Sequence, residues 1–188
     1  MSTTDTKQTI MQAARRVVQA RGYNALSFRE LAKEVGIKSA SIHYHFPTKG
    51  DLGAALAHQY TADAVGYLEQ LLADGEEPDA LMTAYTAAFR TALEHDNRMC
   101  LCGILAAEHH DLPDEVRVEV AGFAEANIAW LGKVLALTQP EATAEKLQAQ
   151  AQSIFAAIQG AQLIARGRDD LAVFDQTIAA YRLAGLLS

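Results

Sequence analysis

The sequence predicts an all-α protein of about nine helices, in which a head of three helices precedes a larger helical body. Apolar residues recur at helical spacing along the chain, and no alternating β-branched run marks a strand. Breaks at Gly22, Gly36, Pro47, Pro113 and Pro140 separate the periodic stretches. Half of the 188 residues are hydrophobic, which is enough for a substantial core.

The first two helices have clear ends. The first covers about residues 6–20, has its apolar residues on one face and is followed by Gly22. The second begins at Ser27, whose spacing to Glu30 is that of a capping box. It ends at Gly36, because glycine adopts a left-handed conformation at the least cost.

The third helix is short and polar. It covers about residues 38–45, with only Ala40, Ile42 and Phe46 available for burial. Pro47 closes it, because proline biases the preceding residue away from helical geometry. A helix, a turn with glycine and a short polar helix form a helix-turn-helix, whose second helix can enter a major groove.

The body is expected to consist of six helices. Thr48 and Asp51 can cap the first of them, and a linker at Asp74–Pro78 follows it. Asp96 or Asn97 is expected to cap a short helix further along. The six expected ranges are 49–72, 79–95, 98–109, 114–137, 142–166 and 170–187.

Charge is distributed unevenly between the two parts. Residues 1–50 carry eight basic and three acidic residues, a net charge of +5, whereas residues 51–188 carry eight basic and twenty acidic ones, a net charge of −12. The alternative is a set of solvated faces, but the basic block coincides with the helix-turn-helix. We therefore predict a polyanion-binding domain at residues 1–48 and a regulatory and dimerisation domain at residues 49–188.

Small residues in the first of the last two helices predict a homodimer. They make a smooth surface on which helices can pack closely, so that two helices from each chain would form a four-helix interface. A helix-turn-helix that reads a palindrome needs such a two-fold dimer. The alternative is that alanine is present only for its helix propensity. The small residues are Ala149, Ala151, Ala156, Ala157, Gly160 and Ala161.

The head resembles the TetR family of bacterial transcriptional regulators. The resemblance covers about residues 9–56 and implies an all-helical homodimer that represses nearby genes and leaves its operator when a small molecule enters the body. His43 departs from the family pattern, which often has tyrosine there. The matching residues are Arg21-Gly22-Tyr23, Leu31-Ala32, Val35-Gly36-Ile37, Ser41-Ile42, Tyr44-His45-Phe46, Lys49 and Leu52.

Eight polar residues are the candidates for contact with double-stranded DNA. Lysine or histidine can read guanine acceptors, and serine is permissive. For Tyr44 the alternative is packing of the third helix onto the second. Expected at base edges or flanking phosphates are Lys38, Ser39, Ser41 and His43; expected on phosphate are Ser27, Arg29, Tyr44 and Lys49.

A small-molecule effector is expected among the middle helices. An apolar, aromatic lining with a few polar groups suits a small apolar or amphipathic ligand, and the alternative is an ordinary core. The expected lining residues are Met82, Tyr85, Phe89, Leu101, Leu105, Phe123, Asn127, Trp130 and Phe155.

Cys100 is a candidate sensor of electrophiles. It is expected in the first turn of a helix, where the helix dipole and Arg98 favour the thiolate. Cys102 would point to nearly the opposite side. The surrounding stretch also resembles the N-ethylmaleimide-reductase repressor (NemR) branch, which implies a sensing role for Cys100; the alternative is an inert core cysteine.

The sequence predicts neither a metal nor a cofactor. Di-iron bundles need paired Glu-x-x-His motifs, and neither these nor a phosphate-binding loop nor a nucleophile elbow occurs. We expect a non-enzymatic cytoplasmic protein, because the N-terminal residues are polar and no apolar stretch reaches the ~18 residues of a membrane span. The competing hypotheses are a helical adaptor and an enzyme without a recognisable motif.

Overall fold

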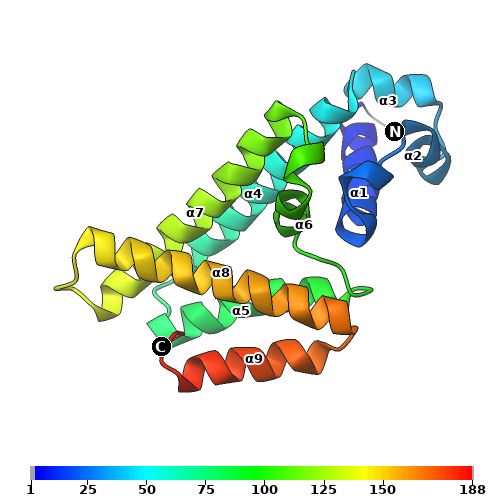
Figure 1. Cartoon of the computed structure of the whole chain (residues 1–188). Coiled ribbons are helices and arrows are strands. Elements are labelled where there is room, and N and C mark those ends of the chain that lie inside the picture. Colours follow the sequence, from blue (N-terminus) through cyan, green and yellow to red (C-terminus); the bar gives the residue numbers. More distant parts are fainter. Residues whose placement is uncertain (1–2, 188) are drawn as a thin grey trace. The chain divides into compact units, whose positions relative to one another are not determined.

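A computed structural model describes residues 3–187 of the chain. Within this range it consists of nine α-helices and two 3-10 helices without any strand, which confirms the predicted all-α fold (Figure 1). The elements are α1 (Thr3–Arg21), η1 (Tyr23–Ala25), α2 (Phe28–Val35), α3 (Ser39–His45), α4 (Lys49–Ala73), α5 (Pro78–Glu94), α6 (Leu101–Ala107), η2 (His109–Asp111), α7 (Asp114–Thr138), α8 (Ala144–Arg168) and α9 (Leu171–Leu183).

The helices form two compact units. The first unit combines the chain up to Thr61 with Cys100–Phe123, and the second combines Ala62–Met99 with the chain from Ala124 onward. The long helices α4 and α7 therefore each contribute one part to the first unit and the other part to the second. The division into a DNA-binding domain and a regulatory domain at residue 48 concerns function and stays a prediction.

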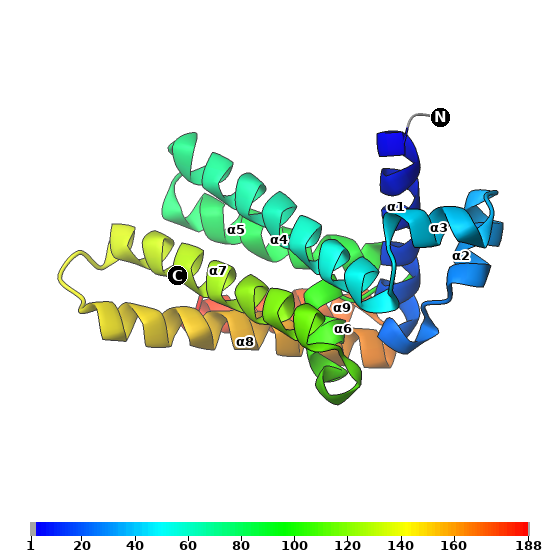
Figure 2. The same ribbon diagram turned by 90° about the horizontal axis from the view of Figure 1, so that it is seen from above.

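Three helices of the first unit form the predicted head. Helices α1, α2 and α3 contact one another, and Figure 2 shows them grouped at one end of that unit. Ile10, Leu31 and Ile42 come from the three helices and are each at most 1% exposed. Burial of such side chains contributes about 1.5–3 kcal/mol each and holds three short helices together.

The second helix ends as its sequence predicts. The Ser27 side chain accepts a hydrogen bond from the backbone N–H of Glu30, which is the Ser27 half of the predicted capping box, and the Glu30 carboxylate accepts from Arg29 and Lys33. Gly36 has a φ of 76°, and the N–H of Ile37 donates to the carbonyl of Ala32 at 2.9 Å. Both the left-handed glycine and the hydrogen bond between residues five positions apart belong to the Schellman motif.

The junction between α3 and α4 is held by reciprocal capping. Phe46 is extended, as its position before Pro47 requires. The Thr48 N–H donates to the Asp51 carboxylate at 2.9 Å, and the Asp51 N–H donates to the Thr48 hydroxyl at 3.0 Å. This confirms the predicted cap and fixes the peptide between Pro47 and Thr48.

A carboxylate from the end of α6 holds the turn that follows α1. The N–H of Tyr23 donates to Glu108 Oε2 at 2.6 Å, and Asn24 Nδ2 donates to Asp111 Oδ2 at 2.8 Å. Gly22 has a φ of 85°, and a Cβ atom there would lie 1.9 Å from Glu108 Oε1. Only glycine therefore fits this close approach.

The predicted cap of α6 is wrong. Asp96 and Asn97 have positive φ angles of 60° and 52° and belong to the turn after α5. Asn97 Nδ2 donates instead to the carbonyl of Arg166 at 3.1 Å and to Asp169 Oδ1 at 2.8 Å. The N-cap residue of α6 is Cys100, so this helix is shorter than expected.

The second unit is built around α8. Helices α5, α8 and α9 contact one another, and α8 and α9 run side by side (Figure 1). Ile154, Ile158 and Phe174 are at most 1% exposed, and Gln162 Nε2 donates to the carbonyl of Phe89 at 2.7 Å. This buried hydrogen bond satisfies an amide inside an otherwise apolar core.

By length and composition alone, α7 could cross a membrane. Its most apolar stretch has a mean hydropathy of 1.3, and a third of that stretch is buried. Buried core helices of soluble proteins have the same composition, and Val116, Trp130 and Leu131 are core residues here.

Candidate DNA-binding surface and effector sites

One face of α3 carries the exposed side chains of the helix-turn-helix. Ile42 and Phe46 are buried against the head, whereas Tyr44 is 77% exposed and His43 is also exposed. Ala40 is exposed too, so the prediction that it is buried is wrong. The reason is helical geometry: Ala40 lies three and four residues before His43 and Tyr44, and therefore on their face.

Ala40 is an exposed residue on the outer face of α3 that the sequence reasoning missed. Its methyl group is too small to serve as an anchor but suits the 5-methyl group of thymine. The signal that identifies it is its i, i+3 and i, i+4 spacing to His43 and Tyr44. Lys38 is exposed at the N-cap of the same helix, and Ser39 and Ser41 are half-buried.

His43 is oriented by two neighbours. Its Nδ1 lies 3.3 Å from the carbonyl oxygen of Pro47. Its ring meets the ring of Phe28 edge-on, with the centroids 4.8 Å apart. These contacts restrict a side chain that is otherwise surrounded by solvent.

Three of the residues expected to bind phosphate already contact other residues of the chain. The Ser27 hydroxyl already accepts the α2 capping hydrogen bond, and the exposed Arg29 lies 3.2 Å from Glu30. Lys49 Nζ lies 4.3 Å from the ring centre of Tyr23. Burial lowers the pKa of Lys49, and the charge of Glu108 opposes this shift. A phosphate would therefore compete with an internal cation–π contact for Lys49.

Four of the expected effector residues form one packed cluster in the second unit. The Tyr85 hydroxyl donates to Asn127 Oδ1 at 2.9 Å, and the Tyr85 ring stacks on Trp130 at 5.3 Å and meets Phe89 at 5.2 Å. Trp130 Nε1 donates to the carbonyl of Leu68 at 2.8 Å. The polar groups satisfy one another, so the cluster is organised as a hydrogen-bonded core.

The other expected effector residues are divided between the two units, and among them Met82 of α5 and Leu101 of α6 are buried. Cys100, Leu105 and Phe123 belong to the first unit, and all three are buried. Phe155 lies on α8 in the second unit and is half-buried. The expected lining thus includes residues of both units, and its role as an effector site stays a prediction.

Cys100 is buried in the first unit and contacts the half-buried Tyr60. It is 1% exposed, and the Tyr60 hydroxyl donates to its Sγ at 3.6 Å. Burial and the neighbouring thiol raise the pKa of Tyr60, so its hydroxyl keeps the proton that it donates. The guanidinium of Arg15, from α1, lies 4.7 Å from the Tyr60 ring centre. Burial also raises the pKa of Cys102 well above its usual range.

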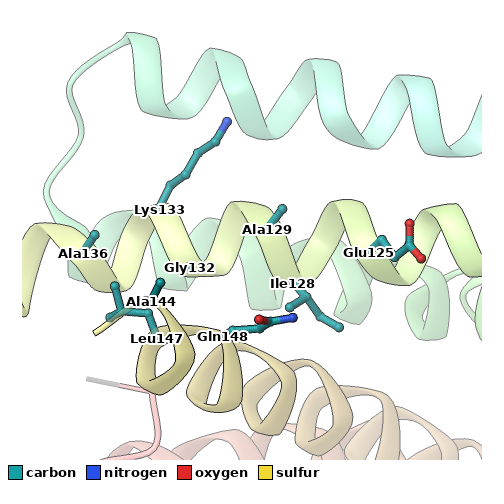
Figure 3. Close-up of a pocket in the computed structure, with 9 residues that line it drawn as sticks. All are labelled: Glu125, Ile128, Ala129, Gly132, Lys133, Ala136, Ala144, Leu147 and Gln148. Carbon is teal, nitrogen blue, oxygen red and sulfur yellow. The ribbon is translucent and has the colours of Figure 1, made fainter. Parts of the chain in front are cut away.

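A hollow of about 550 Å³ lies between α7 and α8 (Figure 3). None of the expected effector residues lines it. Figure 3 shows Lys133 directed toward α4, where its Nζ lies 2.6 Å from Glu69. The lining residues are mostly small or apolar: Glu125, Ile128, Ala129, Gly132, Lys133, Ala136, Ala144, Leu147 and Gln148.

The outer face of α8 and α9 carries exposed apolar side chains. Leu163 and Ile164 of α8 are more than half exposed, and Leu183 of α9 is 92% exposed. Two of the small residues expected on this face are buried inside the second unit instead, because Ala151 and Ala161 point toward its core. Between residues 3 and 187, no group of three His, Cys, Asp or Glu side chains is placed to hold a metal ion.

These features define a helix-turn-helix DNA-binding protein with a helical body. The family model described as "Bacterial regulatory proteins, tetR family" matches residues 10–56. A TetR family regulator from Agrobacterium tumefaciens is 31% identical over 94% of the chain and 95% of its own, with a TM-score of 0.85. The chain belongs to the TetR family of transcriptional regulators.

Other relatives agree with this assignment. A TetR regulator from Legionella pneumophila is 29% identical, covers 95% of the chain and 96% of its own, and has a TM-score of 0.89. The transcriptional regulator AcuR of Cereibacter sphaeroides is 27% identical over 63% of the chain and 55% of its own length. The chain thus spans about half the length of the curated relatives it matches.

The resemblance to the NemR branch extends only to the fold. The reduced form of Escherichia coli NemR has a TM-score of 0.80 at 23% identity, over 94% of the chain and 95% of its own.

Proposed function

We propose that this chain is a cytoplasmic repressor that binds a palindromic operator as a homodimer and leaves it when an effector acts on the body. The observation that carries the proposal is the outer face of α3. It exposes Lys38, Ala40, His43 and Tyr44 at the basic end of an otherwise acidic chain. Such a face suits the major groove, and the acidic remainder of the chain limits contact with DNA to this end.

The exposed apolar face of α8 and α9 supports a dimer. Side chains as exposed as Leu163, Ile164 and Leu183 are stabilised by a partner that covers them. Small residues at Ala156 and Gly160 allow two helices to approach closely. A two-fold dimer would place two recognition helices about 34–36 Å apart, one turn of DNA.

A titration with operator DNA at several salt concentrations tests this proposal. The full chain is titrated against DNA from beside its own gene at salt concentrations between about 50 and 200 mM. We expect a palindromic site to bind more tightly than a single half-site, and affinity to fall by roughly 10³–10⁵ over this salt range.

Lys38→Met should weaken binding to all operators and reduce the salt slope by about one per half-site, because one phosphate contact is lost. Lys133→Met is the matched control, since it removes an exposed lysine of α7 outside the head. Affinity independent of salt, or equal effects of the two substitutions, would contradict the proposal.

A thiol-reactive electrophile is a second candidate effector, and the contacts of Cys100 favour it. Its Sγ touches Tyr60 of α4, and Tyr60 in turn stacks under Arg15 of α1. Because Cys100 is 1% exposed, its alkylation requires transient opening around α6. The added group would then prevent reclosure and disturb the helix that carries Arg15.

Alkylation by a maleimide should therefore lower operator affinity at least tenfold. Cys100→Ser should abolish this response, whereas Cys102→Ser, the matched control at the other buried thiol, should retain it. A Cys100→Ser protein that still responds fully would leave only the small-molecule effector.

A further inference from the structure

The neighbours of His43 favour one position for its ring proton. Nδ1 lies 3.3 Å from the carbonyl oxygen of Pro47, and a carbonyl oxygen can only accept a hydrogen bond. This contact therefore favours the tautomer that carries its hydrogen on Nδ1. A neutral imidazole has one ring hydrogen, so Nε2, on the far edge of the ring, is left as an acceptor.

The capping residues of α4 hold this arrangement in place. The Pro47 carbonyl and the Thr48 N–H belong to one planar peptide. Because the Thr48 N–H donates to the Asp51 carboxylate at 2.9 Å, the carbonyl at the other side of that peptide is fixed toward His43. The ring of Phe28 restricts the imidazole from another side. A local cap thus determines which tautomer the DNA-facing residue presents.

We propose that His43 determines operator specificity by accepting a hydrogen bond at Nε2 from the amino group of adenine or cytosine. In the major groove these amino groups, N6 and N4, are donors, whereas guanine offers only acceptors. This reverses the sequence expectation that His43 donates to guanine. The inference rests on the proposed function, in which the outer face of α3 enters the major groove.

Selection from randomised operator DNA tests the proposal. The wild-type chain, His43→Phe and His43→Lys are compared; all three should fold, because His43 is exposed. At one base position in each half-site, the His43→Phe protein should show no base preference. There the wild type should prefer adenine or cytosine by roughly five- to tenfold, and His43→Lys, which can only donate, should prefer guanine.

The tautomer can be measured independently of DNA. Long-range ¹H–¹⁵N correlation spectra of the free protein should show a protonated Nδ1 and an unprotonated Nε2 for His43. Asp51→Ala should shift His43 toward a mixture of tautomers and flatten the same base preference, although Asp51 lies outside the exposed face of α3. Unchanged tautomer populations in this variant would contradict the role of the cap.

The outcomes separate this inference from the proposed function. If wild type and His43→Lys prefer the same base, His43 acts as a donor and the inference is overturned while DNA binding stands. If no base position responds to His43, the inference also fails. If the chain selects no DNA sequence at all, the proposed function fails with it.

Discussion

Gly22→Ala is expected to lower the free energy of unfolding by about 3–5 kcal/mol, measured in urea at a fixed protein concentration. Gly22 has a φ of 85° and a ψ of 173°, a region in which other residues cost about 1–3 kcal/mol. The new methyl would also lie 1.9 Å from Glu108 Oε1 and push that carboxylate off the Tyr23 N–H. Loss of a charge-assisted hydrogen bond adds about 1.5–3 kcal/mol.

Two other glycines provide matched controls. Gly36 has a φ of 76°, but a Cβ there meets nothing within 4 Å, so Gly36→Ala should show only the conformational cost. Gly66 lies in α4 with open space around it, and Gly66→Ala should be neutral or stabilise by up to about 1 kcal/mol. If Gly22→Ala cost no more than Gly36→Ala, the Glu108 contact would contribute nothing.

A double-mutant cycle isolates that contact. Glu108→Ala removes the carboxylate that the methyl group would displace, so Gly22→Ala should cost less in that background. The residual cost should be that of placing alanine at a φ of 85° and a ψ of 173°. Glu108 is at the end of α6, and Tyr23 follows α1. The same variants should therefore also change the loss of operator affinity that alkylation of Cys100 causes.

Local capping explains why the head was predictable from sequence. Ser27 is satisfied by Glu30, and Thr48 by Asp51, three residues away in each case. Gly36 ends α2 through bonds within its own turn. Such contacts depend on residue type and spacing alone, and the sequence displays both.

Contacts between distant segments were not predictable in this way. Asn97 looks like a helix cap, but its amide binds Asp169, 72 residues further along. Gly22 could be recognised as a helix stop, whereas its closeness to Glu108 depends on how α6 packs. Aromatic residues of the expected effector lining, such as Tyr85 and Trp130, look alike in a core and in a pocket, so their sequence pattern does not distinguish the two.

Ala40→Asp should nearly abolish operator binding without harming the fold. Ala40 is exposed on the face of His43 and Tyr44, so the new carboxylate would face the DNA phosphates. Charge repulsion of about 1–2 kcal/mol in each half-site gives about 2–4 kcal/mol for a dimer, a roughly 30- to 1,000-fold loss of affinity. Any contact of the Ala40 methyl with thymine is lost as well.

The position of Ala40 makes this result interpretable. It is the second residue after the N-cap Lys38, where the helix dipole favours a negative charge, so the folded head should be as stable as before. Ala62→Asp places the same charge on an exposed residue in the interior of α4, where aspartate is less favourable. In fluorescence anisotropy at constant salt, this control should bind like the wild type although its helix is weakened. Equal affinities of Ala40→Asp and Ala62→Asp would show that the outer face of α3 does not meet the DNA.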